Sequence, residues 1–176
     1  MQLDYVGAAA VAGYMTACAV VDYRQHRIPN WLTVPAAVAG LIWSTFAPGG
    51  VGLVAALAGF AVGFGLLLLP WLLGGGGMGD VKMLAALGSW LGPVGILVAF
   101  GLGAVLAALG MMGVLTYSVL AEGFGLTRRR YLAVASAGGS AVPQAGPRRK
   151  RVLPFAVPMA IGTWLYLAWT LWIVSA

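Results

Sequence analysis

The chain has 176 residues, of which 61% are hydrophobic and only 8% are charged, and its net charge is +6. Soluble domains carry about 25% charged residues on average, so this composition excludes an ordinary soluble globule and predicts an integral membrane protein. The positive charge does not indicate nucleic-acid binding, because seven of the ten basic residues lie between Arg128 and Arg151, a distribution typical of membrane topology.

Six apolar segments are predicted to be helices, and the fold class is all-α with about six transmembrane helices. The segments are residues 4–21, 31–47, 51–73, 81–92, 93–121 and 152–175. At about 20 residues per span, six spans nearly exhaust the chain, so we expect residues 1–176 to form a single transmembrane domain. The first segment has neither a basic leader nor a clear cleavage site, so we do not expect a removable signal peptide.

Proline and glycine set the predicted ends of these segments. Pro29 stops the first helix from continuing, and Asn30 is expected to cap the second. The glycine-rich run at 74–79 is not expected to hold a helix. Gly92-Pro93 is expected to break the run between the fourth and fifth segments, and a later turn near Gly101-Leu102-Gly103 stays open as the alternative. Glycines at 59–63 and 95–103 predict close helix packing, and the single cysteine, Cys18, is expected to pack as a small apolar residue.

The basic residues predict the topology. With six spans, all ten lie on one side, which the positive-inside rule identifies as the cytoplasm, and both termini are extracytoplasmic. Five spans would place the 128–151 cluster opposite Arg24 and Lys82. The fourth segment is the weakest, because residues 81–91 as a helix are only about 16 Å long. Residues 122–151 are predicted to be a mobile, basic cytoplasmic loop in contact with anionic lipid.

Two acidic residues carry the functional hypothesis. The sequence has only four acids, Asp4, Asp22, Asp80 and Glu122. A charge at the centre of a membrane helix costs about 2.5–3.5 kcal/mol on insertion scales, so acids beside such helices suggest function. The topology places Asp22 at the cytoplasmic end of the first helix and Asp80 at the cytoplasmic start of the fourth. Two carboxyls at one depth can activate water and protonate a carbonyl, as in aspartic peptidases.

Other interpretations of these residues stay open. Asp80 is also compatible with an ordinary helix N-cap, and Asp22 with a solvated turn residue. If they form a pair, the helix ends suggest Asp80 as the resting base and Asp22 as the resting acid. The glycines are either a linker or a way for extended substrate to approach Asp80. Lys82 either orients Asp80 or marks the interface, and His26 has no partners for a metal site.

Three stretches resemble the type IV prepilin peptidases, which are GxGD intramembrane aspartic proteases. They are residues 22–30 (DYRQHRIPN), 77–82 (GMGDVK) and 153–156 (LPFA). The resemblance covers nearly the whole chain and implies that Asp22 and Asp80 are the catalytic pair. Gly77, Gly79 and Lys82 correspond to motif positions. The implied substrates are type IV prepilin or pseudopilin precursors, cut after a short basic leader at the cytoplasmic membrane face.

The chain departs from larger members of that family, which also N-methylate the mature pilin. Those members carry paired Cys-x-x-Cys motifs between the first two helices, whereas residues 22–30 contain no cysteine. We therefore do not expect methyltransferase activity, and the compact form is similar to peptidases of tight-adherence pilus systems. We expect a bacterial or archaeal cytoplasmic membrane location, no cofactor, no metal and no nucleic-acid partner. The rival classes are a proton- or cation-coupled transporter and a non-catalytic subunit of a pilus or secretion assembly.

Overall fold

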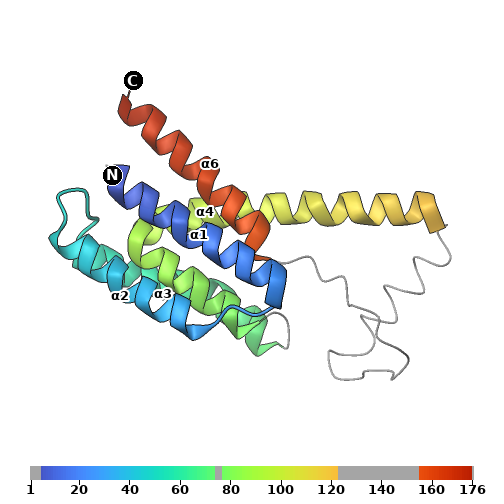
Figure 1. Ribbon diagram of the computed structural model, residues 1–176, viewed down its shortest axis with the longest axis horizontal. Coiled ribbons are helices and arrows are strands. Elements are labelled where there is room, and N and C mark those ends of the chain that lie inside the picture. Colours follow the sequence, from blue (N-terminus) through green and yellow to red (C-terminus); the bar gives the residue numbers. More distant parts are fainter. Residues whose placement is uncertain (1–4, 74–76, 123–154, 176) are drawn as a thin grey trace. The chain divides into compact units, whose positions relative to one another are not determined.

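The computed structural model describes residues 5–73, 77–122 and 155–175, and all regular structure in these ranges is helical (Figure 1). This confirms the predicted all-α class. The helices are α1 (Tyr5–Gln25), α2 (Asn30–Phe46), α3 (Leu53–Leu72), α4 (Met78–Glu122) and α6 (Ala156–Ser175). From residue 123 onward, the predicted basic loop lies outside the described residues.

Four of the described helical stretches are long and apolar enough to cross a membrane. They are Tyr5–Gln25, Leu53–Leu72, Met78–Tyr117 and Ala156–Ile173. The 17-residue helix α2 is too short to count among them. The composition thus indicates a membrane protein, while six spans and outward-facing termini remain predictions.

Helix α4 is interrupted at Gly92, as the sequence predicts. Gly92 has a φ of 69° and a ψ of 179°, and Pro93 follows it, so the helical backbone stops and restarts at this point. A positive φ favours glycine because it lacks a Cβ atom. Helix α4 therefore consists of two helical segments, residues 78–91 and 93–122.

The chain divides into two compact units. The first contains Met1–Leu106 together with Pro154–Ala176, and the second contains Ala107–Leu153. The described part of the second unit is the end of α4, which exposes large apolar side chains such as Leu109, Met112 and Leu120. The cavity described for the candidate site is lined by residues of the first unit alone.

The start of α2 differs from the prediction. The helix begins at Asn30, and the residue that caps it is Pro29, which has an extended backbone. The Pro29 carbonyl accepts the N–H groups of Leu32 and Thr33 at 3.2 and 3.4 Å. Asn30 is therefore the first helical residue, and the prediction that it caps α2 is wrong. Its side-chain oxygen instead accepts a hydrogen bond from Lys82 of α4.

The 78–91 segment is the central helix of the first unit (Figure 1). Almost every side chain from Val81 to Leu91 is buried, which is the pattern of a helix enclosed by others. Against α3, a Cβ atom on Gly59 or Gly63 would collide with the main chain of Gly88 or Leu84. The predicted glycine packing at 59–63 is therefore confirmed: it lets the two backbones touch.

Hydrogen bonds join the central helix to its other neighbours. The Trp90 indole Nε1 donates to the Ala36 carbonyl of α2 at 2.9 Å. The Ser44 hydroxyl of α2 donates to the Ser89 carbonyl at 2.8 Å. On the opposite side, the Tyr14 hydroxyl of α1 donates to the main chain of the central helix at 3.3 Å. These bonds give polar side chains partners within the helix bundle.

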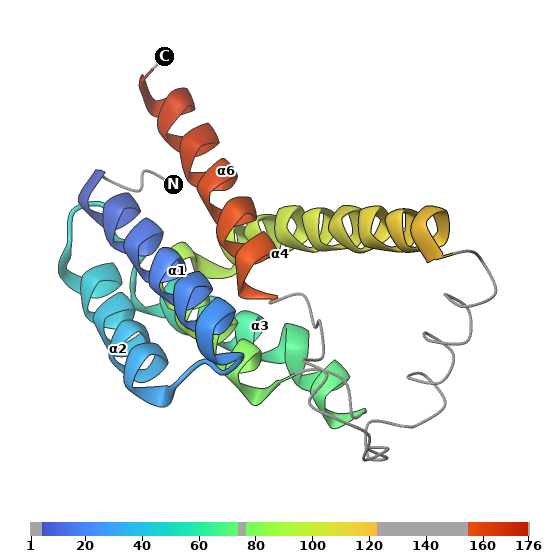
Figure 2. The same ribbon diagram turned by 45° about the vertical axis from the view of Figure 1, so that its right-hand side comes forward.

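Helices α1 and α6 pack side by side (Figure 2). The buried residues of α1 recur at helical spacing along one stripe: Gly7, Ala8, Val11, Tyr14, Met15, Cys18 and Asp22. Cys18 is fully buried, as predicted for a small apolar residue. Asp22 is the one acid on this stripe, so the packing that buries α1 also carries its carboxylate inward.

Candidate active site

Asp22 lies within the last turn of α1, not in the turn that follows it. The helix extends to Gln25, and the Asp22 side chain is only 8% exposed. Its carboxylate oxygen Oδ2 accepts the main-chain N–H of Ala156, the first residue of α6, at 3.1 Å. The interpretation of Asp22 as a solvated turn residue is therefore wrong.

Asp80 lies in the first turn of α4, which begins two residues earlier at Met78. Its main-chain N–H donates to the Gly77 carbonyl at 3.1 Å. Asp80 is thus inside the helix, and the interpretation of it as the N-cap residue does not hold. The helix also includes Gly79, so the predicted glycine break at 74–79 extends too far by at least two residues.

The two motif glycines lie where side chains would interfere with the site. A Cβ atom on Gly79 would be 3.1 Å from the Ile28 Cβ and 3.3 Å from the Ile28 main-chain N and O. A Cβ atom on Gly77 would be 3.3 Å from Oδ2 of Asp80. Glycine at these positions therefore lets the start of α4 approach both the α1–α2 loop and its own carboxylate closely.

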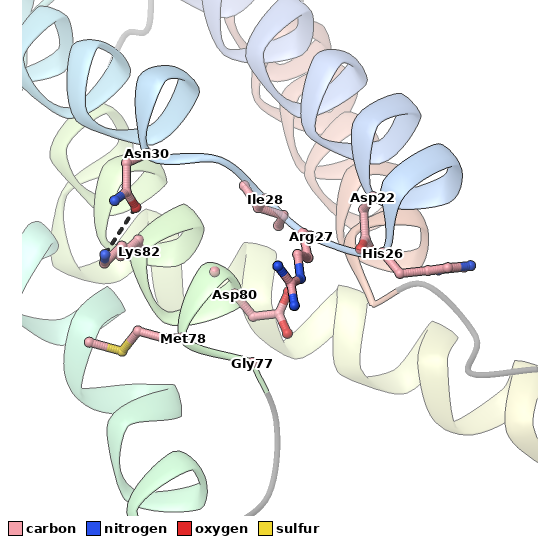
Figure 3. Close-up of a pocket in the computed structure, with 10 residues that line it drawn as sticks. Asp22, His26, Arg27, Ile28, Asn30, Gly77, Met78, Asp80 and Lys82 are labelled. Atoms are coloured by element: carbon pink, nitrogen blue, oxygen red, sulfur yellow. Dashed lines mark hydrogen bonds between the residues drawn. The ribbon is translucent and has the colours of Figure 1, made fainter. Parts of the chain in front are cut away.

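Lys82 connects α4 to the start of α2. Its ammonium group donates to Oδ1 of Asn30 at 3.0 Å (Figure 3). The partner that the structure gives Lys82 is therefore Asn30, which follows Ile28 by two residues, while Lys82 itself follows Asp80 by two residues on α4. This bond holds the α1–α2 loop against α4 from its far end.

All five predicted site residues line one cavity. It has a volume of about 460 Å³ and opens between the start of α4 and the α1–α2 loop (Figure 3). Its lining residues are Asp22, His26, Arg27, Ile28, Asn30, Gly77, Met78, Gly79, Asp80 and Lys82. Asp22 and Asp80, which are 58 positions apart in sequence, thus face a single cavity. Its size falls within the 300–1,000 Å³ common for ligand sites.

The α1–α2 loop supplies His26 and Arg27 to the lining. His26 follows the end of α1 with a φ of 52°, a left-handed conformation that turns the chain sharply toward Arg27 and Ile28. Among the residues that the structure describes, no group of three or more His, Cys, Asp or Glu side chains is arranged to hold a metal ion. The lining contains two carboxyl groups, those of Asp22 and Asp80, and the basic side chains of Arg27 and Lys82.

The contact with Ala156 changes the electrostatic argument about the pair. The hypothesis that Asp22 is the resting acid considered only the C-terminal end of α1. The structure adds the N-terminal end of α6, where the helix dipole favours a negative charge. Both carboxyls therefore lie at a helix N-terminus, and position on α1 alone no longer favours a neutral Asp22.

Sequence reasoning missed Ala156 as a member of the site. It stands in the 153–156 stretch that carries the resemblance, but an alanine at a helix start has no side-chain chemistry to attract notice. The feature that could have identified Ala156 is its position as the first residue of a helix, where the main-chain N–H has no acceptor within that helix.

The chain is similar in sequence to known leader peptidases. The model of the type IV leader peptidase family matches residues 9–126, more than half of the chain. A prepilin leader peptidase/N-methyltransferase from Dickeya chrysanthemi is 38% identical over 99 residues, covering 51% of this chain and 34% of that protein. Proteins of the same name from Burkholderia pseudomallei strain 1026b and Aeromonas salmonicida strain A449 are 37% identical over 93 residues and 27% identical over 175 residues.

The matched part covers 49% of this chain and 30% of the Burkholderia protein, and 92% of this chain and 50% of the Aeromonas protein. The chain thus spans between about a third and a half of the length of these relatives. No solved structure matches it. The matched region contains both cavity aspartates and the motif glycines, and the chain belongs to the type IV leader peptidase family.

Proposed function

We propose that this chain is a membrane-embedded aspartic endopeptidase that removes the leader peptide from type IV prepilin-like precursors. Asp22 and Asp80 are the catalytic pair. The observation that carries the proposal is that these two acids line one 460 Å³ cavity in a chain of the leader peptidase family. The named activity of the relatives supports the choice of substrate class.

The proposed reaction is a general acid–base hydrolysis without a covalent enzyme intermediate. The ionised carboxyl removes a proton from a water molecule, and the resulting hydroxide attacks the scissile carbonyl carbon while the protonated carboxyl donates its proton to the carbonyl oxygen. The carboxyl that took the proton from water then donates it to the leaving nitrogen, the C–N bond breaks, and one hydroxyl of the tetrahedral intermediate returns its proton to the other carboxylate. The products are the leader with a new carboxyl group and the mature protein with a new amino group.

The glycines have a specific part in this proposal. A peptide must be extended to expose its carbonyl, and Gly77 and Gly79 keep the approach to Asp80 free of side chains. Lys82 and Asn30 hold the α1–α2 loop against α4, so that the two carboxyls face the same space. We further propose that the site lies at the cytoplasmic face of the cytoplasmic membrane, in a six-span topology with both termini outside.

The decisive experiment is co-expression with a prepilin and comparison of Asp22→Asn and Asp80→Asn with the unaltered chain. Both substitutions keep the side-chain shape and remove the acid, so processing should fall by about 10²- to 10⁴-fold. Precursor size on a gel reports processing, and an immunoblot of the membrane fraction confirms equal protein levels. Wild-type processing by either variant would refute the catalytic assignment.

We propose that the chain does not methylate its product. The larger family members that do so carry a cysteine-rich insertion, and residues 22–30 contain no cysteine. Mass spectrometry of the mature N-terminus after co-expression tests this point separately. An unmethylated amine is expected, and a methylated one made by this chain alone would contradict the proposal.

A further inference from the structure

We propose that α6 is part of the active site, because the main-chain N–H of Ala156 positions the Asp22 carboxylate. This inference rests on the proposed peptidase function and assigns a positioning role outside the motif around Asp80. It concerns a residue 134 positions from Asp22 in the chain. The α1–α6 contact places the two next to each other.

The contact is well shielded from solvent. Asp22 is 8% exposed and Ala156 is fully buried, and Oδ2 accepts the Ala156 N–H at 3.1 Å. A carboxylate that accepts an N–H bond in such surroundings is held more firmly than one at a surface. With Oδ2 engaged, the remaining oxygen, Oδ1, is the one left to contact water in the cavity.

The local backbone of α6 makes the donor available. The Phe155 carbonyl already accepts the N–H of Met159 at 3.4 Å, so Phe155 caps the helix and Ala156 is its first residue. The N–H of a first helical residue has no acceptor within its own helix. Here the acceptor comes from α1. The N-terminus of α6 thereby fixes one oxygen of the Asp22 carboxylate in place.

The sharpest test replaces Ala156 with lactic acid, which keeps the methyl side chain and exchanges the N–H for an ester oxygen. Ala156→Pro is a second variant, because proline also lacks the N–H and is favoured at the first position of a helix. The matched control is lactic acid at Ala160, a buried alanine about one turn further along α6, whose N–H lies beyond the first turn of the helix.

Loss of the donor should lower kcat for prepilin cleavage by about 10- to 100-fold and leave KM within about twofold. The Ala160 control should lose stability but keep the kcat of its folded fraction. A purely structural role would instead lower the folded amount of both variants alike. Equal kcat values for the Ala156 and Ala160 variants would overturn the inference.

A stability measurement separates this inference from the peptidase assignment. The ester at Ala156 should lower the unfolding temperature more in the unaltered chain than in Asp22→Ala, since the bond exists only in the former. Absence of this coupling would overturn the inference whatever the activity. Coupling in a protein that cleaves no prepilin would uphold the contact and refute the peptidase function instead.

Discussion

Substitution of Gly79 by alanine should impair catalysis without unfolding the protein. The added Cβ would lie 3.1 Å from the Ile28 Cβ and 3.3 Å from the Ile28 main-chain N and O, whereas ordinary contacts begin near 3.4 Å. Ile28 is only 8% exposed and lies in the short connection between α1 and α2, so it has little space to retreat. The start of α4 and the loop must therefore separate by a few tenths of an ångström.

The magnitude follows from the sensitivity of catalysis to position. A misplacement of 1 Å can cost about 10²-fold in rate, so a shift of a few tenths corresponds to about a 3- to 10-fold lower kcat. Stability should change by less than about 1 kcal/mol, because alanine is the better helix former by about that amount and offsets the strain. The control is Gly65→Ala in α3, where a Cβ atom meets nothing within 4 Å.

The assay is cleavage of a purified prepilin in detergent or liposomes, with kcat and KM determined separately and thermal unfolding measured in parallel. Gly65→Ala should match the unaltered chain in kcat and equal or exceed it in stability. A Gly79→Ala enzyme with unchanged kcat would refute the argument that close approach at this position sets the geometry of the site. A large loss of stability would show that the contact is needed for folding instead.

Three further predictions concern contacts around the site. Lys82→Met and Asn30→Ala should each lower stability by about 1 kcal/mol, and a double-mutant cycle between them should show coupling. Gly88→Ala should strongly reduce membrane accumulation, since its Cβ would collide with the main chain of Gly59; an undiminished yield would contradict the backbone contact. Trp90→Phe should cost about 1 kcal/mol in thermal unfolding, because the bond to α2 is lost, and an unchanged unfolding temperature would count against that bond.

Much of the site could be predicted because the sequence contains few charged residues. Only four acids are present, and the basic residues suggest a common side for Asp22 and Asp80. Both line the cavity, as do Gly77, Gly79 and Lys82. The helix positions were predictable for the same reason, since glycine, proline and polar residues interrupt long apolar runs.

The wrong predictions for the end of α1 and the starts of α2 and α4 have a common physical cause. An apolar pattern shows where side chains leave the hydrocarbon layer, and a helix can continue past that point. Residues 23–25 are polar or aromatic and compatible with a helix, so α1 continues to Gln25 and keeps Asp22 inside. Gly79 is tolerated in the first turn of α4 for a tertiary reason, its contact with Ile28. Asn30 has its partner at Lys82, 52 positions away, which no local capping rule can reveal.

The central helix has a consequence for how water and substrate meet. Residues 78–91 form a segment of about 21 Å, shorter than the roughly 30 Å hydrocarbon layer. A segment this short either leaves its end beneath the headgroups or draws the bilayer surface inward around it. If residues 78–91 form a span of their own, as the proposed six-span topology requires, the shortfall at the Asp80 end would place the cavity at a dip in the lipid surface. In the proposed reaction, water would then reach the scissile bond while the apolar helix of the precursor stays in the acyl chains alongside.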